Sequence, residues 1–179
     1  GSPDGTRGFD LLHQHLTRDR GYRSRPAFLA RSRGGLMAYG WAAAHPDLVA
    51  GVGGIYPVCD LRSYPGLERA APAFDLTPEE LSGRLAEFNP VDRLTALAAA
   101  GIPILHLHGD QDRTVPLGAN SAEVARRYLE LGGPMTLRVF EDRGHDMWEG
   151  WFRSAELTDF LIDRAVAEAA TPAGEAPPP

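Results

Sequence analysis

The amino-acid sequence predicts an α/β fold with a mostly parallel sheet that helices cover on both faces. Short apolar segments of strand length alternate along the chain with segments of helical periodicity. Glycine and proline residues separate the two kinds of segment. The 179 residues are 43% hydrophobic and 23% charged, a mixture typical of one globular domain with a buried core.

Four apolar segments are candidate strands, at residues 26–30, 49–56, 102–107 and 135–140. Helical segments separate them, as the crossover connections of a parallel sheet require. The carboxyl ends of such strands lie at one edge of the sheet, where ligands bind in this class of fold. We therefore expect any chemistry directly after the strands. The residues at these places are 31–35, 59–60, 109–112 and 144–145.

Helices are predicted over residues 9–20, 33–44, 91–100, 120–131 and 152–167. In the first of them, Phe9, Leu12 and Leu16 recur at the spacing of an amphipathic helix. A further helix is expected to begin at Thr77, because this residue is followed by proline and, three positions on, by the glutamate of a capping box. Proline and glycine interrupt residues 60–73, which we expect to be irregular.

Composition bounds the domain organisation and excludes several classes of function. We expect residues 1–170 to form one domain and the proline-rich residues 171–179 to form a disordered tail. A net charge of −6 argues against a nucleic-acid or membrane partner. The single cysteine, Cys59, excludes an internal disulfide, and the absence of lysine excludes Schiff-base chemistry. The sequence indicates no compartment.

A serine, an aspartate and a histidine follow three of the predicted strands. They are Ser32, Asp112 and His145, in that order along the chain. A serine hydroxyl becomes a good nucleophile when a neighbouring imidazole takes its proton. The imidazole in turn needs a carboxylate that holds its tautomer and stabilises its positive charge. Because a parallel sheet gathers its strand ends, these three side chains are the candidate catalytic residues.

The segments around these residues resemble motifs of the α/β-hydrolase family. Residues 30–34 (ARSRG) resemble the nucleophile elbow G-x-S-x-G, with Ala30 in place of the first glycine. Residues 107–116 (LHGDQDRTVP) are similar to the acid loop, and the similarity aligns the acid on Asp112. Residues 142–146 (DRGHD) are similar to the histidine loop. Within the family, the chain looks most like the prolyl-oligopeptidase and acyl-esterase branches.

The resemblance implies the C-terminal portion of an α/β-hydrolase fold and a serine hydrolase that cleaves a carboxylic ester or an amide through an acyl-enzyme. Ser32 would be the nucleophile, His145 the general base and then acid, and Asp112 the residue that orients His145. The backbone N–H of Arg33 would contribute to the oxyanion hole. A small-molecule ester or a peptide would be the substrate, without a cofactor or a metal ion. Residues 60–87 lie where the family inserts a lid.

The resemblance also implies missing neighbours. In the family, several strands precede the elbow, and the loop after the third strand supplies a second oxyanion donor. This sequence begins after those strands, so we expect a longer hydrolase or one half of an assembly. The strand at 26–30 would then be an exposed sheet edge. An N-terminal segment or a second copy of the chain would pair with it.

Several alternatives stay open at this point. Asp110 and Asp60 compete with Asp112 as the acid, although Asp110 is expected to hydrogen-bond within its loop. His106 and His108 resemble part of the H-x-H-x-D-H signature of metal-dependent hydrolases, but Gln111 stands where the closing histidine would be. A non-catalytic interpretation is also possible, in which the chain is the remnant of a hydrolase and serves as an interaction module.

The surroundings of the candidate site allow two interpretations each. Trp148, Trp151 and Phe152 would either line a substrate pocket or pack under the last helix. Arg31 and Arg33 flank the serine, where they would either bind a substrate anion or face solvent.

Overall fold

The computed structural model describes residues 1–167, so the predicted tail at 171–179 lies outside the described residues. Within this range, one sheet of four parallel strands has the order β1-β2-β3-β4. The strands are β1 (Ala27–Arg31), β2 (Gly51–Ile55), β3 (Ile104–Gly109) and β4 (Met135–Phe140). In register, Ala30 lies opposite Gly54, and Gly109 lies opposite Phe140. The predicted α/β fold with a parallel sheet is confirmed.

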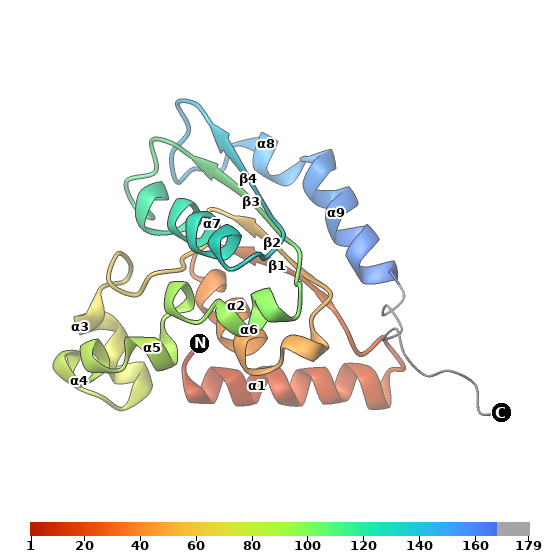
Figure 1. Cartoon of the computed structure of the whole chain (residues 1–179), viewed down its shortest axis with the longest axis horizontal. Coiled ribbons are helices and arrows are strands. Elements are labelled where there is room, and N and C mark those ends of the chain that lie inside the picture. Colours follow the sequence, from red (N-terminus) through yellow and green to blue (C-terminus); the bar gives the residue numbers. More distant parts are fainter. Residues whose placement is uncertain (168–179) are drawn as a thin grey trace.

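Helices cover both faces of the sheet, and each face has its own core (Figure 1). The helices on one face are α1 (Pro3–Gln14), α2 (Gly34–Ala44), α6 (Thr95–Ala99) and α7 (Ser121–Glu130). The buried residues of this core include Trp41, Leu97 and Tyr128. On the other face lie α8 (Glu149–Phe152) and α9 (Ala155–Val166), where Trp151 and Leu157 are buried against the sheet.

The segment after β2 is more regular than the sequence indicates. It contains the short helices α3 (Leu67–Ala70), α4 (Pro78–Gly83) and α5 (Leu85–Phe88), together with a 3₁₀ turn at Ala71–Phe74. These elements lie at the lower left of Figure 1 and enclose an apolar cluster of their own, which explains why the expected irregular structure is wrong for residues 67–73. The capping box at Thr77 is confirmed, since both of its hydrogen bonds with Glu80 are present.

Several boundaries differ from the predicted ones for local reasons. The first helix begins at Pro3 because the Ser2 side chain caps it, and it continues as a π-helical segment at His15–Asp19. The predicted helix at 152–167 is divided into α8 and α9 by Ser154, which caps α9. The predicted helix at 91–100 is a 3₁₀ turn at Pro90–Asp92 followed by α6.

Strand β1 lies at one end of the sheet and pairs, among the described residues, only with β2. The side chain of Leu29 on this strand is 58% exposed. In contrast, every residue of β3 is buried, because β3 has a neighbour on each side and helices above and below. Among residues 1–167, no helix combines the length and the apolar character that crossing a bilayer demands.

Candidate active site

Ser32 occupies a strained turn between β1 and α2. Its φ of 49° lies in the left-handed region, which a residue with a side chain adopts at a cost. The turn is fastened to the next loop, since the carbonyl of Ser32 accepts from the Val58 N–H at 2.8 Å. Gly35 makes this approach feasible, because a Cβ there would lie 2.4 Å from the Val58 carbonyl oxygen. Ala30, which replaces the usual glycine of the elbow, is buried and lies opposite Gly54 in the strand register.

The hydroxyl of Ser32 begins a chain of two hydrogen bonds. Its Oγ lies 2.9 Å from His145 Nε2, and His145 Nδ1 lies 2.8 Å from Asp112 Oδ2. An ionised carboxylate only accepts, so the hydrogen of the imidazole is on Nδ1, and Nε2 is the acceptor for the serine hydroxyl. The three residues singled out in the sequence therefore meet at the carboxyl ends of β1, β3 and β4.

Asp112 is held on both of its oxygens. The backbone N–H groups of Thr114 and Val115 donate to Oδ1 at 2.9 and 2.8 Å, which leaves Oδ2 for His145. Burial alone would raise the pKa of Asp112, but the His108 imidazole, the Val115 N–H and His145 together hold this pKa below its ordinary value. Asp112 is therefore a carboxylate at neutral pH.

The aromatic ring of Tyr56 packs against the imidazole of His145. Tyr56 follows β2 directly, with a φ of 36°, and its ring centroid lies 4.2 Å from that of His145. Its hydroxyl donates to the carbonyl oxygen of Asp146 at 2.9 Å. The Asp146 carboxylate accepts from the Trp151 indole and the Trp148 N–H, and these bonds lower the pKa of Asp146. The histidine loop is thus fixed directly after His145, while Tyr56 packs against the imidazole itself.

The acid loop and the histidine loop touch through their backbones. The Gln111 N–H donates to the carbonyl oxygen of Arg143 at 2.9 Å. A Cβ on Gly109 would lie 2.1 Å from the same oxygen, so glycine is the residue that allows the two loops to approach. This contact lies directly before Asp112 and two residues before His145, so it joins the two loops that carry these residues.

The sequence model of the prolyl oligopeptidase family matches residues 14–162. The chain belongs to the prolyl oligopeptidase family. Comparison with curated proteins finds no match. Among solved structures, puromycin hydrolase is 25% identical over 86% of this chain and 24% of its own, with a TM-score of 0.66.

Two further solved structures share the fold of this chain. The acylaminoacyl peptidase of Pyrococcus horikoshii is 19% identical over 90% of this chain and 28% of its own, with a TM-score of 0.70. The puromycin-hydrolyzing peptidase of Mycobacterium tuberculosis is 21% identical over 92% of this chain and 26% of its own, with a TM-score of 0.69. This chain therefore spans about a quarter of the length of these proteins, and the expected α/β-hydrolase fold is confirmed.

The two competing acids of this family member lie apart from the histidine. Asp60 is buried and bonds instead to Arg62 and Asn89. The side chain of Asp110 is exposed and makes no hydrogen bond within residues 1–167, so the expectation that it bonds within its loop is wrong. Of the three aspartates, the structure brings Asp112 to His145.

The two histidines of β3 are fully buried and bond to protein groups. His106 Nε2 lies 2.8 Å from the Tyr39 hydroxyl, and His108 Nε2 lies 2.9 Å from the Val115 carbonyl oxygen. Both imidazoles contact Ser121 through Nδ1. In the described part of the chain, no three His, Cys, Asp or Glu side chains are arranged to hold a metal ion.

The aromatic residues after the histidine loop divide between core and surface. Trp151 is fully buried and packs edge-on against Tyr56. Phe152 is 44% exposed, and the guanidinium of Arg31 lies 5.7 Å from its ring centroid. Arg33 is exposed. Arg31 and Phe152 therefore form part of the surface beside Ser32.

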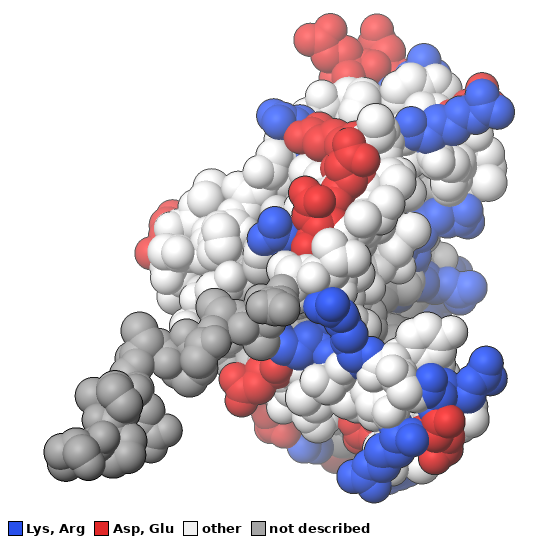
Figure 2. All heavy atoms as spheres, turned by 90° about the vertical axis from the view of Figure 1, so that its right-hand side faces the viewer, with Lys and Arg blue, Asp and Glu red and all other residues white. Residues whose placement is uncertain are grey.

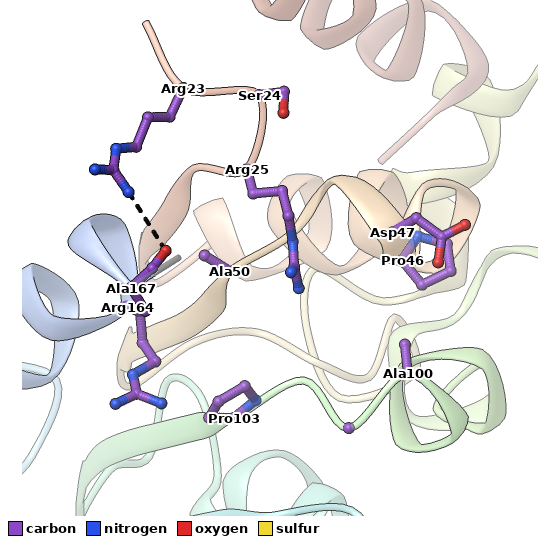
Figure 3. Close-up of a pocket in the computed structure, with 11 residues that line it drawn as sticks. Arg23, Ser24, Arg25, Pro46, Asp47, Ala50, Ala100, Pro103, Arg164 and Ala167 are labelled. Atoms are coloured by element: carbon purple, nitrogen blue, oxygen red, sulfur yellow. Dashed lines mark hydrogen bonds between the residues drawn. The ribbon is translucent and has the colours of Figure 1, made fainter. Parts of the chain in front are cut away.

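A cavity of about 800 Å³ lies at the opposite end of the strands. Its lining includes Arg23, Arg25 and Arg164, and Figure 3 shows that these residues come from the segment before β1 and from the last helix. Acidic and basic side chains both occur on the face that carries α9 (Figure 2). This cavity borders none of the three residues at Ser32, Asp112 and His145.

Sequence reasoning missed Tyr56 and Gly109. The predicted strand at 49–56 includes Tyr56 as its last residue, whereas β2 ends at Ile55 and the tyrosine lies at the active edge. An aromatic residue directly after a buried strand was the available signal. Gly109 stands inside the acid-loop motif, but its contact with Arg143 depends on a segment more than thirty positions away.

Proposed function

We propose that this chain is the catalytic region of a serine hydrolase that cleaves a carboxylic ester or an amide. The observation that carries the proposal is the pair of hydrogen bonds from Ser32 through His145 to Asp112, at 2.9 and 2.8 Å. The order of the three residues and the strained turn at Ser32 support it as well. Membership of the prolyl oligopeptidase family is consistent with this chemistry.

The proposed reaction has two halves. Ser32 Oγ attacks the substrate carbonyl while its proton passes to His145 Nε2, and the Asp112 carboxylate stabilises the imidazolium through Nδ1–H. His145 then gives the proton to the leaving oxygen or nitrogen, which departs and leaves an acyl-enzyme. In the second half, water attacks the acyl group, His145 takes the water's proton and returns one to Ser32, and the free acid leaves.

The N–H of Arg33 is the proposed donor to the oxyanion. Arg33 follows the nucleophile and is the N-cap of α2, and its N–H makes no hydrogen bond to an acceptor among residues 1–167. The positive end of the helix dipole favours negative charge at the same place. One such donor contributes on the order of 10²–10³ to the rate.

The substrate class proposed here is an ester or a peptide-like amide. The similar structures include proteins described as an acylaminoacyl peptidase and a puromycin-hydrolyzing peptidase, and a peptidase cleaves an amide, which supports the amide. Arg31 and Phe152 form part of the surface that a substrate would meet. We propose that residues 60–87 cover the substrate as a lid.

Turnover of two chromogenic substrates tests the proposal. The chain is expected to release nitrophenol from a p-nitrophenyl ester and nitroaniline from an aminoacyl p-nitroanilide, with a burst of one equivalent from the ester. Ser32→Ala is expected to abolish both reactions, and Ser24→Ala, an exposed serine in the segment before β1, is the control. A folded chain that turns over neither substrate, or a Ser32→Ala variant with wild-type rates, would contradict the proposal.

The open edge of β1 supports a second proposal, which concerns partners. Leu29 is 58% exposed on a strand whose second edge has no neighbour among the described residues. We propose that a strand from an N-terminal segment or from a second copy of the chain pairs here. If the chain proved folded but inactive, this edge would be the basis of the alternative role as an interaction module.

A further inference from the structure

Four buried side chains form a hydrogen-bonded chain between the helix of the nucleophile and the loop of the acid. Tyr39 of α2 contacts His106 Nε2 at 2.8 Å, and His106 Nδ1 lies 3.0 Å from Ser121 Oγ. Ser121 Oγ lies 2.7 Å from His108 Nδ1, and His108 Nε2 lies 2.9 Å from the carbonyl oxygen of Val115. All four side chains have at most 1% of their surface exposed.

The direction of every bond in this chain follows from its two ends. The Val115 carbonyl only accepts, so His108 Nε2 carries a hydrogen. At the other end, His106 is the one hydrogen-bond partner of the Tyr39 hydroxyl within residues 1–167, so the hydroxyl hydrogen needs His106 Nε2 as its acceptor. His106 then carries its hydrogen on Nδ1 and donates to Ser121, and Ser121 donates to His108 Nδ1.

In this arrangement each imidazole donates through one nitrogen and accepts through the other. A second hydrogen on His108 would occupy Nδ1, the acceptor of the Ser121 hydroxyl, and would leave the buried Ser121 hydrogen without its acceptor, which is costly. Burial, followed by the nearby His108, lowers the pKa of His106 to about 3, in agreement with a neutral ring. The chain of four residues therefore selects one tautomer of His108, with its hydrogen on Nε2.

The selected N–H points at the turn that holds the acid. His108 Nε2 binds the carbonyl of Val115, whose own N–H donates to Asp112 Oδ1. The same nitrogen lies 3.5 Å from Asp112 Oδ2, the oxygen that binds His145. His108 therefore contacts both the turn and the carboxylate through the same nitrogen.

We propose that His108 is a positioning residue for Asp112, and that Tyr39, His106 and Ser121 hold it in the required tautomer. The inference rests on the proposed function, since its purpose is to keep Asp112 directed at His145. It assigns the histidine pair of β3 to the support of the acid and places one end of that support on α2, the helix that begins beside Ser32.

Labelling kinetics with a fluorophosphonate test the proposal on the whole chain. His108→Leu removes both ring nitrogens, and His108→Gln retains an N–H at about the place of Nε2. The leucine variant is expected to label roughly 10²-fold more slowly, because a small misplacement of a catalytic group has an effect of this order. The loss is expected in the labelling step rather than in reagent binding. The glutamine variant should recover most of the rate at equal thermal stability.

The second readout is the low-field proton NMR signal of the His145 Nδ1 hydrogen, with Asp112→Asn as the reference for its loss. His108→Leu should weaken or shift this signal, and Ser121→Ala should do so to a smaller extent through the tautomer of His108. If His108→Leu fails to fold, Ser121→Ala and His108→Gln carry the test.

The outcomes separate the inference from the proposed function. A folded His108→Leu or Ser121→Ala variant with wild-type labelling and an unchanged low-field signal would overturn the positioning role. A wild-type chain that is never labelled would instead overturn the proposed function, and the NMR signal of the variants would still decide whether His108 holds Asp112. Equal losses in the leucine and glutamine variants would also contradict the role of the N–H.

Discussion

The two halves of the candidate site differ in how completely their surroundings support them. Asp112 and His145 follow β3 and β4, and Asp112 has hydrogen-bond partners on both oxygens. Ser32 follows β1, a strand at the end of the sheet on which Leu29 is 58% exposed. The N–H of Arg33 beside it has no acceptor among the described residues.

This difference predicts how substitutions in the two parts of the site affect the protein. The acid and the histidine form a self-contained unit, because loop–loop contacts and buried side chains within the described chain hold them. Strand β1, like β4 at the other end of the sheet, has one paired edge among the described residues, and the N–H of Arg33 beside the nucleophile has no acceptor there. We therefore expect substitutions around Asp112 and His145 to change the rate of catalysis. Substitutions at the unpaired edge of β1 should change the association of the chain with a partner.

The largest effect is expected from breaking the contact between Asp112 and His145. Asp112→Asn retains the shape of the side chain but favours the wrong tautomer of the histidine, and kcat should fall by roughly 10⁴. Steady-state kinetics with the p-nitrophenyl ester measure this. Asp110→Asn, two positions away on the surface, should retain the wild-type kcat. Equal losses in both variants would show that Asp112 has no special role.

A smaller effect is expected from separating the acid loop from the histidine loop. Gly109→Ala forces a Cβ against the Arg143 carbonyl, and should destabilise the fold by about 1–3 kcal/mol while lowering kcat. Urea denaturation measures the first effect and ester hydrolysis the second. Gly118→Ala is the matched control, because nothing lies within 4 Å of a Cβ there. A Gly109→Ala variant as stable and active as the control would contradict the close approach.

A pH effect should follow from the environment of Asp112. Because folding lowers the pKa of this carboxyl, its contribution to stability is present above its unfolded pKa and is lost as pH falls through the folded pKa. The free energy of unfolding should therefore decrease below about pH 4, since the unfolded carboxyl titrates there. Asp112→Asn should lose less stability over the same range. Urea titrations at several pH values compare the two, and parallel curves would contradict the lowered pKa.

The smallest effect on catalysis is expected at the edge of β1. Leu29→Lys places a charge on the exposed strand and should reduce self-association while leaving kcat unchanged. Leu129→Lys on α7 is the control, because its side chain is 56% exposed and lies away from the edge. Sedimentation velocity over a range of concentrations measures the association. A change in association equal to that of the control would show that this edge has no partner.

The sequence was informative where a residue's role depends on its place after a strand. Ser32, Asp112 and His145 each follow an apolar segment, and a parallel sheet brings such positions together whatever the details of packing. The position of Tyr56 at the active site was not predicted, because an apolar segment does not show at which residue the strand ends. The short helices α3 to α5 depend on a local apolar cluster rather than on periodicity, which is also why residues 60–73 were expected to be irregular.

Side-chain contacts between different helices and strands could not be predicted from the sequence. The approach of Tyr39 to His106 depends on the rotation of α2 against β3, and that of Ser121 depends on where α7 begins. Leu12 and Leu16 also show that the sequence pattern does not determine which surfaces are in contact. Their spacing predicts an apolar helix face, but within the described residues Leu12 remains 51% exposed and Leu16 36% exposed.

The central claim is that His145 and Asp112 activate the hydroxyl of Ser32. The most direct test is to treat the chain with a fluorophosphonate and locate the adduct by mass spectrometry of its peptides. One adduct per chain on Ser32, absent from Ser32→Ala and strongly slowed in His145→Ala, is the expected result. A folded chain that forms no adduct, or an adduct on another residue that persists in Ser32→Ala, would contradict the claim.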